Sequence, residues 1–586
     1  MKARGPGRLE LLGLLAILVL AALTRLPGID ARGQWDADQG HDMLVLHALV
    51  TDGEVPLLGP KTSIGTFHHG ALYYYLLAPA AAVSDADPAA VTIEFALLGI
   101  AAVAATWWLA RLVGGPVAAM FAGLLAAVSP AGIDESTFIW NPNPIPLFAA
   151  LAFAGAILGR RTGRARWWIL AGLGTMMVTQ LHVLGVVIVV PMAWIWASAV
   201  LRTRRLGDPL RPLVLGGAGA LALVAAGYLP LLIHDLGHDF EETRAILAYA
   251  AGGGREASAG LATRLVLVAL RSVTWPLTGL ITDRAAVSIL VAVAAVVIGT
   301  IAVLGRRAGD IGRVGEAGRV GDLGVPAVEA AAPGASVTPG ASRPGTPAEI
   351  PDARWLAGTL GWSVLTLAAF APSLATVTPG LPNDHYHSVL DPLVITLVAT
   401  GLARIWSARR TAGAAASRGI ASAGGGPASP GRGLTPGRSC TNRGLTPGRV
   451  LATVVAAALL ACGVTAWPPA VSPDGGWPGA DAAAAQVRQM TDGQPVALDG
   501  LPSFKSSDAL GFPLLRRGTD IVDPQTHPPY YVLVCDPLFN EVMGAPCGGP
   551  AETAWMQQAG VKVGPPQSID GGSRRWISVY QAAGEP

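Results

Sequence analysis

Residues 9–26, LELLGLLAILVLAALTRL, decide the fold class of this chain. The stretch is almost wholly apolar, and it is long enough for one helix to cross the hydrocarbon core of a bilayer. Basic residues precede it at Lys2, Arg4 and Arg8, and no small-x-small cleavage site stands out before Pro27. We therefore expect an uncleaved first span with its amino end in the cytoplasm, rather than a signal peptide.

The whole chain has the composition of a polytopic membrane protein. Of its 586 residues, 51% are hydrophobic and 14% are charged, and the mean hydropathy is +0.47. A soluble globular protein of this length does not need so much apolar surface. The net charge of +2 says nothing about partners. No basic run resembles a nucleic-acid-binding surface, so we expect no nucleic-acid partner.

Apolar runs of roughly 17–25 residues, each long enough to span a bilayer, recur along the chain. They predict about eleven transmembrane helices by this criterion, at 9–26, 91–113, 114–130, 143–159, 167–183, 184–201, 211–233, 286–304, 355–376, 388–406 and 450–466. The apolar segments 71–83 and 261–282 are short or interrupted, and we expect them at the outer interface. The arginine-rich loops then all fall on the cytoplasmic side. This predicts a multi-pass protein of the cytoplasmic membrane with its carboxyl end outside.

Residues 1–466 form the predicted transmembrane module, and residues 467–586 form a predicted second domain. Within the module, 306–353 and 407–449 are low in complexity and cannot bury a core, so we expect disordered cytoplasmic loops. The second domain has an ordinary soluble composition. A helix is predicted at 480–490, with strands at 495–498, 530–534 and 576–580. We therefore expect a small extracytoplasmic α/β domain.

The chain has four cysteines. Cys535 and Cys547 lie in the predicted extracytoplasmic domain, where an oxidising compartment would allow them to pair in a disulfide. Cys462 lies in the last predicted span and Cys440 in a cytoplasmic loop. No cysteine or histidine spacing is typical of a zinc site.

An acidic motif, Trp35-Asp36-Ala37-Asp38-Gln39-Gly40-His41-Asp42, follows the first span. Carboxylates near lipid are costly, so a group of them at the end of a span favours a functional interpretation. Asp38 is the first candidate for a general base, because a carboxylate can take the proton of an incoming hydroxyl. Asp36 and Asp42 would tune this base, and Asp36, Asp38, His41 and Asp42 together could hold a divalent cation, which prefers oxygen ligands. The alternative is a hydrated acidic loop without chemistry, because charges outside the hydrocarbon cost little.

Basic and aromatic side chains follow in the same loop. A phosphate or pyrophosphate needs cationic partners, and the candidates here are Lys61, His68 and His69. A histidine near neutral pH is only partly charged. The aromatic candidates for substrate contacts are Tyr73 and Tyr74, in a run that ends at Tyr75. Aromatic residues also anchor proteins at a membrane interface, and we expect that role for at least two of these tyrosines.

Distant segments bring further polar residues to the same predicted face. One follows the span at 114–130, one ends the span at 167–183, and one fills the short loop before 388–406. A lone histidine at a helix end is more often structural than functional. Two distant polar clusters, at 180–182 and 383–387, reach the same face as the acidic motif, and this favours a functional interpretation. The candidate substrate contacts are Trp140, Asn141, Gln180, His182 and Tyr386, and the further candidate phosphate ligands are His385 and His387.

Together these motifs resemble the GT-C membrane glycosyltransferases, in particular the branch of protein O-mannosyltransferases and aminoarabinose transferases. Asp38-Gln39 stands where those enzymes usually have Asp-Glu. The segment 69–73, His-Gly-Ala-Leu-Tyr, stands where they have His/Lys-Pro-Pro-Leu and an aromatic residue. The resemblance covers most of 9–233 and again 355–406. This sequence departs from the pattern by having Gln39 for the second acid and a Gly-Ala pair for the two prolines.

The resemblance implies a GT-C fold and a polyprenyl-phosphate sugar as donor, presented at the outer leaflet. It implies inverting transfer, in which Asp38 deprotonates the hydroxyl of a glycan, lipid or protein acceptor. The lipid phosphate would leave with help from cations such as Lys61, His69 or His385. Many members of this family need no metal, while others use one. The resemblance therefore implies no required cofactor and leaves a divalent cation open. The domain at 467–586 would position the acceptor.

Two alternatives remain open from the sequence. A flippase or other polyprenyl-lipid transporter would also have many spans, but it would place ionisable residues near mid-membrane and often shows repeated halves. Here the span centres are almost free of charge, and no such repeat appears. The second alternative is a family member that has lost catalysis, because Gln39 replaces the usual acid.

Overall fold

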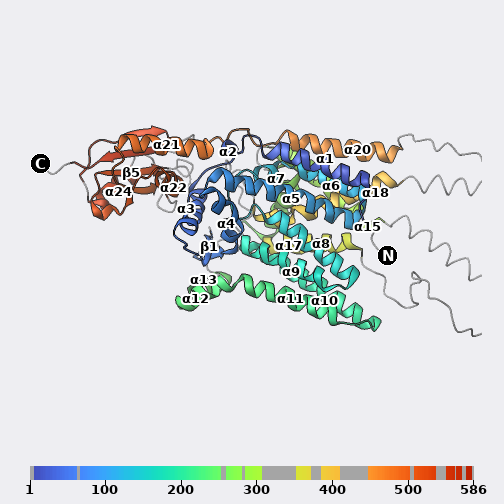
Figure 1. Cartoon of the computed structure of the whole chain (residues 1–586). Coiled ribbons are helices and arrows are strands. Elements are labelled where there is room, and N and C mark those ends of the chain that lie inside the picture. Colours follow the sequence, from blue (N-terminus) through green and yellow to red (C-terminus); the bar gives the residue numbers. More distant parts are fainter. Residues whose placement is uncertain are drawn as a thin grey trace, which may run out of the picture.

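The computed structural model describes residues 5–62, 66–251, 259–279, 284–305, 351–370, 385–408, 446–501, 507–535, 550–560, 562–570 and 576–583. They form a bundle of long helices and a C-terminal region that contains a β-sheet (Figure 1). Helices α3 and α4 and strand β1 lie between these two parts. We call residues 27–87, which include these elements, the first loop. It is placed where both parts can contact it.

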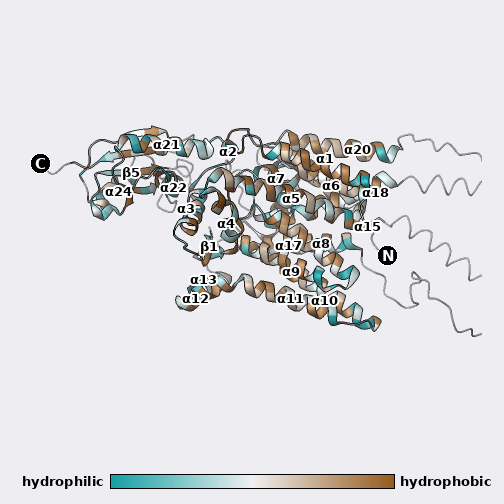
Figure 2. Cartoon of the chain, viewed as in Figure 1, coloured by the Kyte–Doolittle hydropathy of each residue, from teal (hydrophilic) through white to brown (hydrophobic). Residues whose placement is uncertain are grey.

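The long helices of the bundle are apolar over most of their length, and hydrophobic colouring dominates them (Figure 2). They are α1 (Arg8–Arg25), α5 (Pro88–Gly114), α6 (Pro116–Val128), α8 (Ile145–Thr162), α9 (Ala165–Leu181), α10 (Val189–Leu206), α11 (Arg211–Gly227), α14 (Leu261–Thr278), α15 (Ala285–Leu304), α17 (Asp352–Phe370), α18 (Asp391–Ser407) and α20 (Pro447–Val464). Short elements join them, namely α2 (Ile29–Arg32), α7 (Pro130–Asp134), α12 (Leu229–Gly237), α13 (Glu241–Ala250) and the 3-10 helices η1 (Val183–Ile188) and η3 (His385–Leu390).

Among the described residues, six helices are long and apolar enough to cross a membrane, or seven if α11 and α12, which are bent by 44°, form one span. The chain is therefore a multi-pass helical membrane protein. The other predicted spans also fall on helices, α1, α6, α9 and α17, but these do not meet the same length and composition standard. The predicted total number of spans stays a prediction. Helix α14, which covers most of the segment 261–282, is not among the six.

Basic helix ends lie together at one end of the bundle. Arg160 and Arg161, at the end of α8, both pair with Asp352 at the start of α17. Arg111, near the end of α5, pairs with Glu10 in the first turn of α1 at 2.7 Å. These helices therefore run in alternating directions, and their basic ends share one side, as the positive-inside pattern requires.

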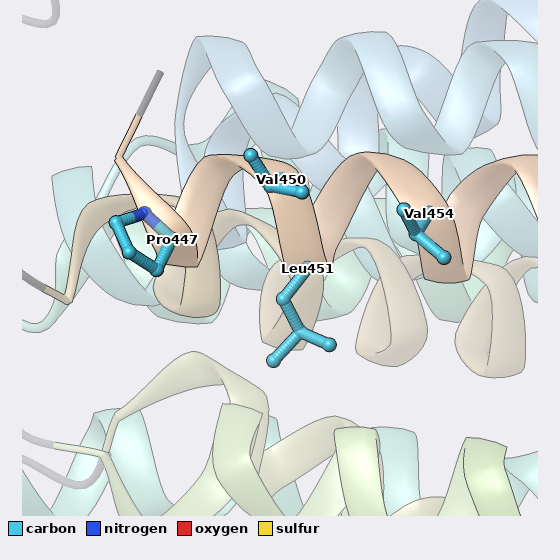
Figure 3. A pocket seen from close by; sticks show the side chains of 4 residues that line it. All are labelled: Pro447, Val450, Leu451 and Val454. Carbon is cyan, nitrogen blue, oxygen red and sulfur yellow. The ribbon is translucent and has the colours of Figure 1, made fainter. Parts of the chain in front are cut away.

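Helix α18 forms the centre of the bundle. Its span is 89% buried, whereas the spans of α15 and α20 are 28% and 22% buried and carry exposed aliphatic side chains. A shallow groove of about 410 Å³ lies on α20, lined by Pro447, Val450, Leu451 and Val454 (Figure 3). Because none of these side chains has a polar group, the groove offers no chemistry, and the candidate site must lie elsewhere.

In the first loop, helix α3 (Ala37–Thr51) packs on α4 (Leu72–Ser84), and α4 packs on α5 and α9. Strands β1 (Leu58–Lys61) and β2 (His68–Gly70) pair antiparallel beside them. Tyr73, Leu77 and Ala81 recur at helical spacing on the buried face of α4, and Tyr74 is buried as well. The expectation that these tyrosines act as interfacial anchors is wrong for Tyr73 and Tyr74, because both are enclosed by protein.

The C-terminal region contains a five-stranded sheet in the order β4-β3-β5-β7-β6. Its elements are α21 (Gly476–Met490), β3 (Val496–Leu501), α22 (Asp508–Arg516), β4 (Ile521–Val522), η4 (Pro524–Thr526), β5 (Tyr530–Cys535), α24 (Pro550–Ala559), β6 (Gln567–Asp570) and β7 (Trp576–Gln581). Strand β3 is parallel to β4 and β5, and β7 is antiparallel to β5 and β6. The predicted helix and three predicted strands correspond to α21, β3, β5 and β7, whereas the short edge strands β4 and β6 were not predicted.

Some predictions concern residues outside the described part of the chain. Cys547 is one of them, so its pairing with Cys535, which is buried at the end of β5, stays a prediction. Most of 306–353 and 407–449 also lies outside the described residues. The predicted disorder of these loops stays a prediction too.

Candidate active site

The acidic motif forms the beginning of α3. Asp36 is the N-cap residue, and its carboxylate accepts a hydrogen bond from the Ala37 backbone N–H at 2.7 Å. The Gln39 side-chain oxygen accepts from the Asp36 backbone N–H at 2.9 Å, which completes a capping box. The Gln39 amide nitrogen donates to the backbone oxygen of Ile139 at 2.8 Å, and the side chain is buried. Gln39 therefore joins α3 to the segment before α8, which is a structural role for this residue.

Asp38 lies in the first turn of α3 and is exposed. The backbone N–H groups at a helix N-terminus favour negative charge, so this position stabilises a carboxylate. Asp36 is half-buried and occupied in the cap. Of the three candidate acids, only Asp38 combines an exposed carboxylate with a position in the first turn.

Asp42 is buried one turn further along α3. Its carboxylate oxygens accept hydrogen bonds from the hydroxyls of Tyr73 at 2.6 Å and Tyr74 at 2.9 Å. Burial raises the pKa of Asp42 to about 7, and the hydrogen bond from Tyr73 is the largest of the contacts that oppose this rise. Burial also raises the pKa values of Tyr73 and Tyr74 well above their usual value, so both remain donors. The two tyrosines predicted to contact substrate thus hold Asp42.

His68 is held by a carboxylate that the sequence analysis did not single out. Its Nδ1 lies 2.7 Å from Glu242 Oε1, and its backbone N–H donates to Glu242 Oε2 at 2.7 Å. Glu242 belongs to α13 and is buried, and its backbone N–H donates to Asp235 at 3.0 Å. The His68 imidazole was predicted to bind phosphate, and its Nδ1 is paired with Glu242 instead. No local signal could have found this pair, because 174 residues separate the partners.

The rings of His69 and His182 pack together, with centroids 4.8 Å apart and planes tilted by 37°. The Nδ1 of His69 accepts from the Val183 backbone N–H at 3.3 Å, and that of His182 accepts from the Leu184 N–H at 3.2 Å. Burial lowers the pKa of His69 well below its usual value, and the neighbouring histidines lower it further. With Nδ1 as acceptor, the neutral ring carries its proton on Nε2. His69 is therefore a neutral N–H donor, and the expectation of a cation here is wrong.

Gly70 explains why prolines are absent from this position. A Cβ atom on Gly70 would overlap the side-chain oxygen of Gln180. Gln180 is buried at the end of α9. Asn141 donates to the backbone oxygen of Leu181 at 2.5 Å. The structure thus brings Gln180, His182 and Asn141 together with the first loop, as the sequence predicted for one face.

The remaining candidates differ in their surroundings. Lys61 is exposed at the end of β1, and Trp140 is half-buried with its ring 5.7 Å from that of Phe138. His387 is fully buried beside the central helix, and its predicted role in binding phosphate stays a prediction. The side chains of His385 and Tyr386 lie outside the described part, so their predicted roles stay predictions.

Within the described residues, one group of three ligand-type side chains lies close enough to hold a metal ion. It comprises His234, Glu241 and Glu242, whose ligand atoms all lie within 4.8 Å of one another. His234 Nε2 lies 3.0 Å from Glu241 Oε1. The predicted cation ligands Asp36, Asp38, His41 and Asp42 do not form such a group, because Asp36 caps the helix and Asp42 points into the protein.

No protein-family model matches the sequence, and no curated protein matches it. Among solved structures, the chain resembles apo ArnT from Cupriavidus metallidurans, with a TM-score of 0.53 at 12% identity over 97% of both chains. The same protein bound to undecaprenyl phosphate gives a TM-score of 0.51 at 13% identity, again over 97% of both chains. An apo oligosaccharyltransferase from Archaeoglobus fulgidus gives 0.43 at 13% identity, over 82% of this chain and 58% of that one.

At this level of identity the likeness to ArnT shows the fold. The chain has a GT-C fold, and the resemblance predicted from its motifs is confirmed at that level. The match to ArnT extends over nearly the whole of both chains, so it includes the bundle and the C-terminal region.

Proposed function

We propose that this chain is an inverting glycosyltransferase that moves a sugar from a polyprenyl-phosphate donor to an acceptor hydroxyl. The observation that carries the proposal is an exposed carboxylate, Asp38, in the first turn of a loop helix at the end of a GT-C bundle. The ArnT structure with undecaprenyl phosphate supports a polyprenyl phosphate as the carrier lipid. The first loop lies at the end opposite to the basic helix ends, which favours an active site on the outer face of the cytoplasmic membrane.

In the proposed step, Asp38 accepts the proton of the acceptor hydroxyl as the oxygen attacks the anomeric carbon. The new bond joins the acceptor oxygen to that carbon. The bond from the carbon to the phosphate oxygen breaks, and the polyprenyl phosphate leaves with the electron pair. Attack from the opposite side inverts the configuration at the sugar. Asp42 stays buried and keeps α3 in place through its tyrosine partners.

The leaving phosphate needs positive charge and N–H donors. Lys61 offers an exposed ammonium from β1, in the same loop as Asp38. His69 and His182 offer neutral Nε2–H groups, which donate hydrogen bonds to phosphate or sugar oxygens without adding charge. This chain therefore binds its donor with one exposed lysine and neutral donors, rather than with several histidine cations.

The acceptor is the hydroxyl of a glycan, lipid or protein. Where a divalent cation binds, its ligands are His234, Glu241 and Glu242 rather than the acidic motif. The cation would then stand beside His68, which shares Glu242. Its role there would be to fix α13 against the first loop.

The test is transfer in liposomes containing the purified full chain, with a panel of undecaprenyl-phosphate hexoses and pentoses and extracted envelope glycan as acceptor. The variant is Asp38→Asn, which removes the base and keeps the shape of the side chain. Loss of a general base lowers the rate by about 10²–10⁴-fold. The matched control is Asp52→Asn, because Asp52 is an exposed carboxylate at the other end of the same helix.

The outcomes separate the competing functions. Loss of transfer in Asp38→Asn, with donor binding and the Asp52→Asn rate unchanged, supports the assigned base. Wild-type transfer by Asp38→Asn refutes it. Exposure of the donor at the second leaflet without any transfer would instead identify a flippase. No activity of either kind by the wild-type chain on the whole panel would identify a family member without catalysis.

A further inference from the structure

The first turn of α22 in the C-terminal region lies directly on the middle of the acidic motif. A Cβ atom on Gly40 would overlap the backbone oxygen of Asp508. Any other residue at position 40 would therefore push α22 away from α3. Gly40 is buried and stands between Asp38 and Asp42 on α3. This close approach between the two parts of the molecule thus falls within the residues proposed to act in transfer.

Polar and aromatic contacts surround this approach. His41 Nδ1 lies 3.0 Å from Asp508 Oδ2, and the Trp35 indole donates to the backbone oxygen of Ala509 at 2.8 Å. The Trp35 ring is buried, with ring centroids 4.7 Å from Trp477 on α21 and 6.0 Å from Phe512 on α22. Buried aromatic clusters of this kind contribute beyond the area they bury. The first loop and the C-terminal region therefore form a packed interface with a buried aromatic centre.

At the C-terminal end of α22, Arg516 contacts a second part of the first loop, the turn at residues 85–86. The Arg516 guanidinium donates to the backbone oxygen of Ala86 at 2.8 Å and to that of Asp85 at 3.2 Å. Both residues have positive φ, 55° for Asp85 and 51° for Ala86, a conformation that is costly for residues other than glycine. Arg516 therefore stabilises the strained turn that joins α4 to α5. Helix α22 spans from the acidic motif to this turn.

Helix α3 is thus held from two sides. On the bundle side, Asp42 bonds to the tyrosines of α4, and Gln39 bonds to Ile139. On the other side, Gly40 and His41 meet α22. Without α22, Gly40 and His41 would lose these contacts, and α3 would be held from the bundle side by Asp42 and Gln39.

We propose that the C-terminal region is a positioning element for transfer: by docking α22 on Gly40, His41 and Trp35, it sets where the Asp38 carboxylate lies. This rests on the proposed function of Asp38 as the base. It differs from a role in acceptor binding, because its contacts are with the catalytic loop itself. A displacement of about 1 Å in a catalytic group can lower a rate by about 100-fold, so a small shift of α3 is enough.

The test uses Gly40→Ala in the full chain, with Gly361→Ala as the matched control. Both glycines lie in helices, but a Cβ on Gly361 of α17 would meet nothing within 4 Å. We expect Gly40→Ala to lower kcat by about 100-fold while the KM for the undecaprenyl-phosphate sugar changes little. Amide hydrogen exchange should become faster in α3 and stay unchanged in α5. Gly361→Ala should behave as the wild type in both measurements.

A second pair of variants keeps the test decisive if Gly40→Ala does not fold. Arg516→Met removes the bonds to Ala86 and Asp85, whereas Arg516→Lys keeps a donor. Faster exchange in α3 and lower kcat in Arg516→Met, with partial rescue by Arg516→Lys, support the proposal. Faster exchange with wild-type kcat in both Gly40→Ala and Arg516→Met overturns it. If Asp38→Asn keeps wild-type transfer, the proposed base fails instead. In that case, amide exchange of α3 in Gly40→Ala and Arg516→Met tests only whether α22 holds α3 in place. Unchanged exchange in both variants would overturn this docking role as well.

Discussion

The buried carboxylate of Asp42 allows a prediction about stability and pH. Its pKa in the folded protein is about 7, well above its ordinary value, because burial disfavours the charged form. The folded state therefore binds a proton more tightly than the unfolded state does. The stability that this proton contributes is complete below the unfolded pKa and is lost as the pH rises through about 7.

Replacing Tyr73 by Phe removes the shorter of the two hydrogen bonds that the carboxylate accepts, the one at 2.6 Å. A hydrogen bond to a charged group contributes about 1.5–3 kcal/mol, and one pKa unit corresponds to about 1.4 kcal/mol. Because the neutral carboxyl also loses a weaker hydrogen bond, the pKa of Asp42 should rise by about one unit in this variant. At high pH the variant should be less stable than the wild type by about 1.5–3 kcal/mol, and at low pH, where the carboxyl is neutral, by about 0.5–1.5 kcal/mol.

The measurement is thermal unfolding of the purified chain in nanodiscs at about pH 5.5 and about pH 9, on either side of the folded pKa. Tyr73→Phe should lose more stability at the higher pH. In an Asp42→Asn background, which carries no titrating group at this position, the same substitution should cost equal amounts at both pH values. An equal cost at both pH values in the wild-type background would show that the carboxylate is not what Tyr73 stabilises.

Two further predictions concern the departures from the family pattern. Gln39→Glu restores the usual acid but places a buried carboxylate against the backbone oxygen of Ile139, so we expect a loss of about 1–3 kcal/mol in stability and no gain in transfer; higher activity at unchanged melting temperature would contradict the structural role of Gln39. Gly70→Ala forces a methyl group onto the Gln180 side chain, and overpacking of this kind costs about 1–3 kcal/mol. Thermal unfolding beside the control Gly361→Ala measures that cost, and equal melting temperatures would refute the close approach.

The fold was largely predictable because a bilayer permits few solutions. Apolar runs predicted the helices, and the described helices follow the predicted segments closely, whereas their sidedness stays a prediction. The number of spans was less certain, since α6 and α9 are short and α14 lies among the bundle helices without being apolar enough to count as a span. In the C-terminal region, alternation predicted β3, β5 and β7, but β4 has only two residues and offers no pattern to read.

The residues of the acidic motif were predictable as neighbours, but the surroundings of each side chain were not. The motif placed Asp36, Asp38 and Asp42 together correctly, because they follow one another in the sequence. Their division into a cap, an exposed acid and a buried acid depends on helix phase and on the tyrosines that cover Asp42. His69 was expected as a cation and is a neutral donor, because its burial against His182 could not be read from its neighbours in the chain.

By itself the sequence determined that this protein has the apolar helices of a multi-pass membrane protein, and which loop carries the acids. Hydrophobicity and charge decide these properties segment by segment, so no knowledge of packing is needed. Only the tertiary structure decided that Glu242 holds His68, that Gln39 joins α3 to Ile139, and that α22 rests on Gly40. These contacts join residues 100 to 468 positions apart, and what each side chain can do there depends on the partner that folding brings to it.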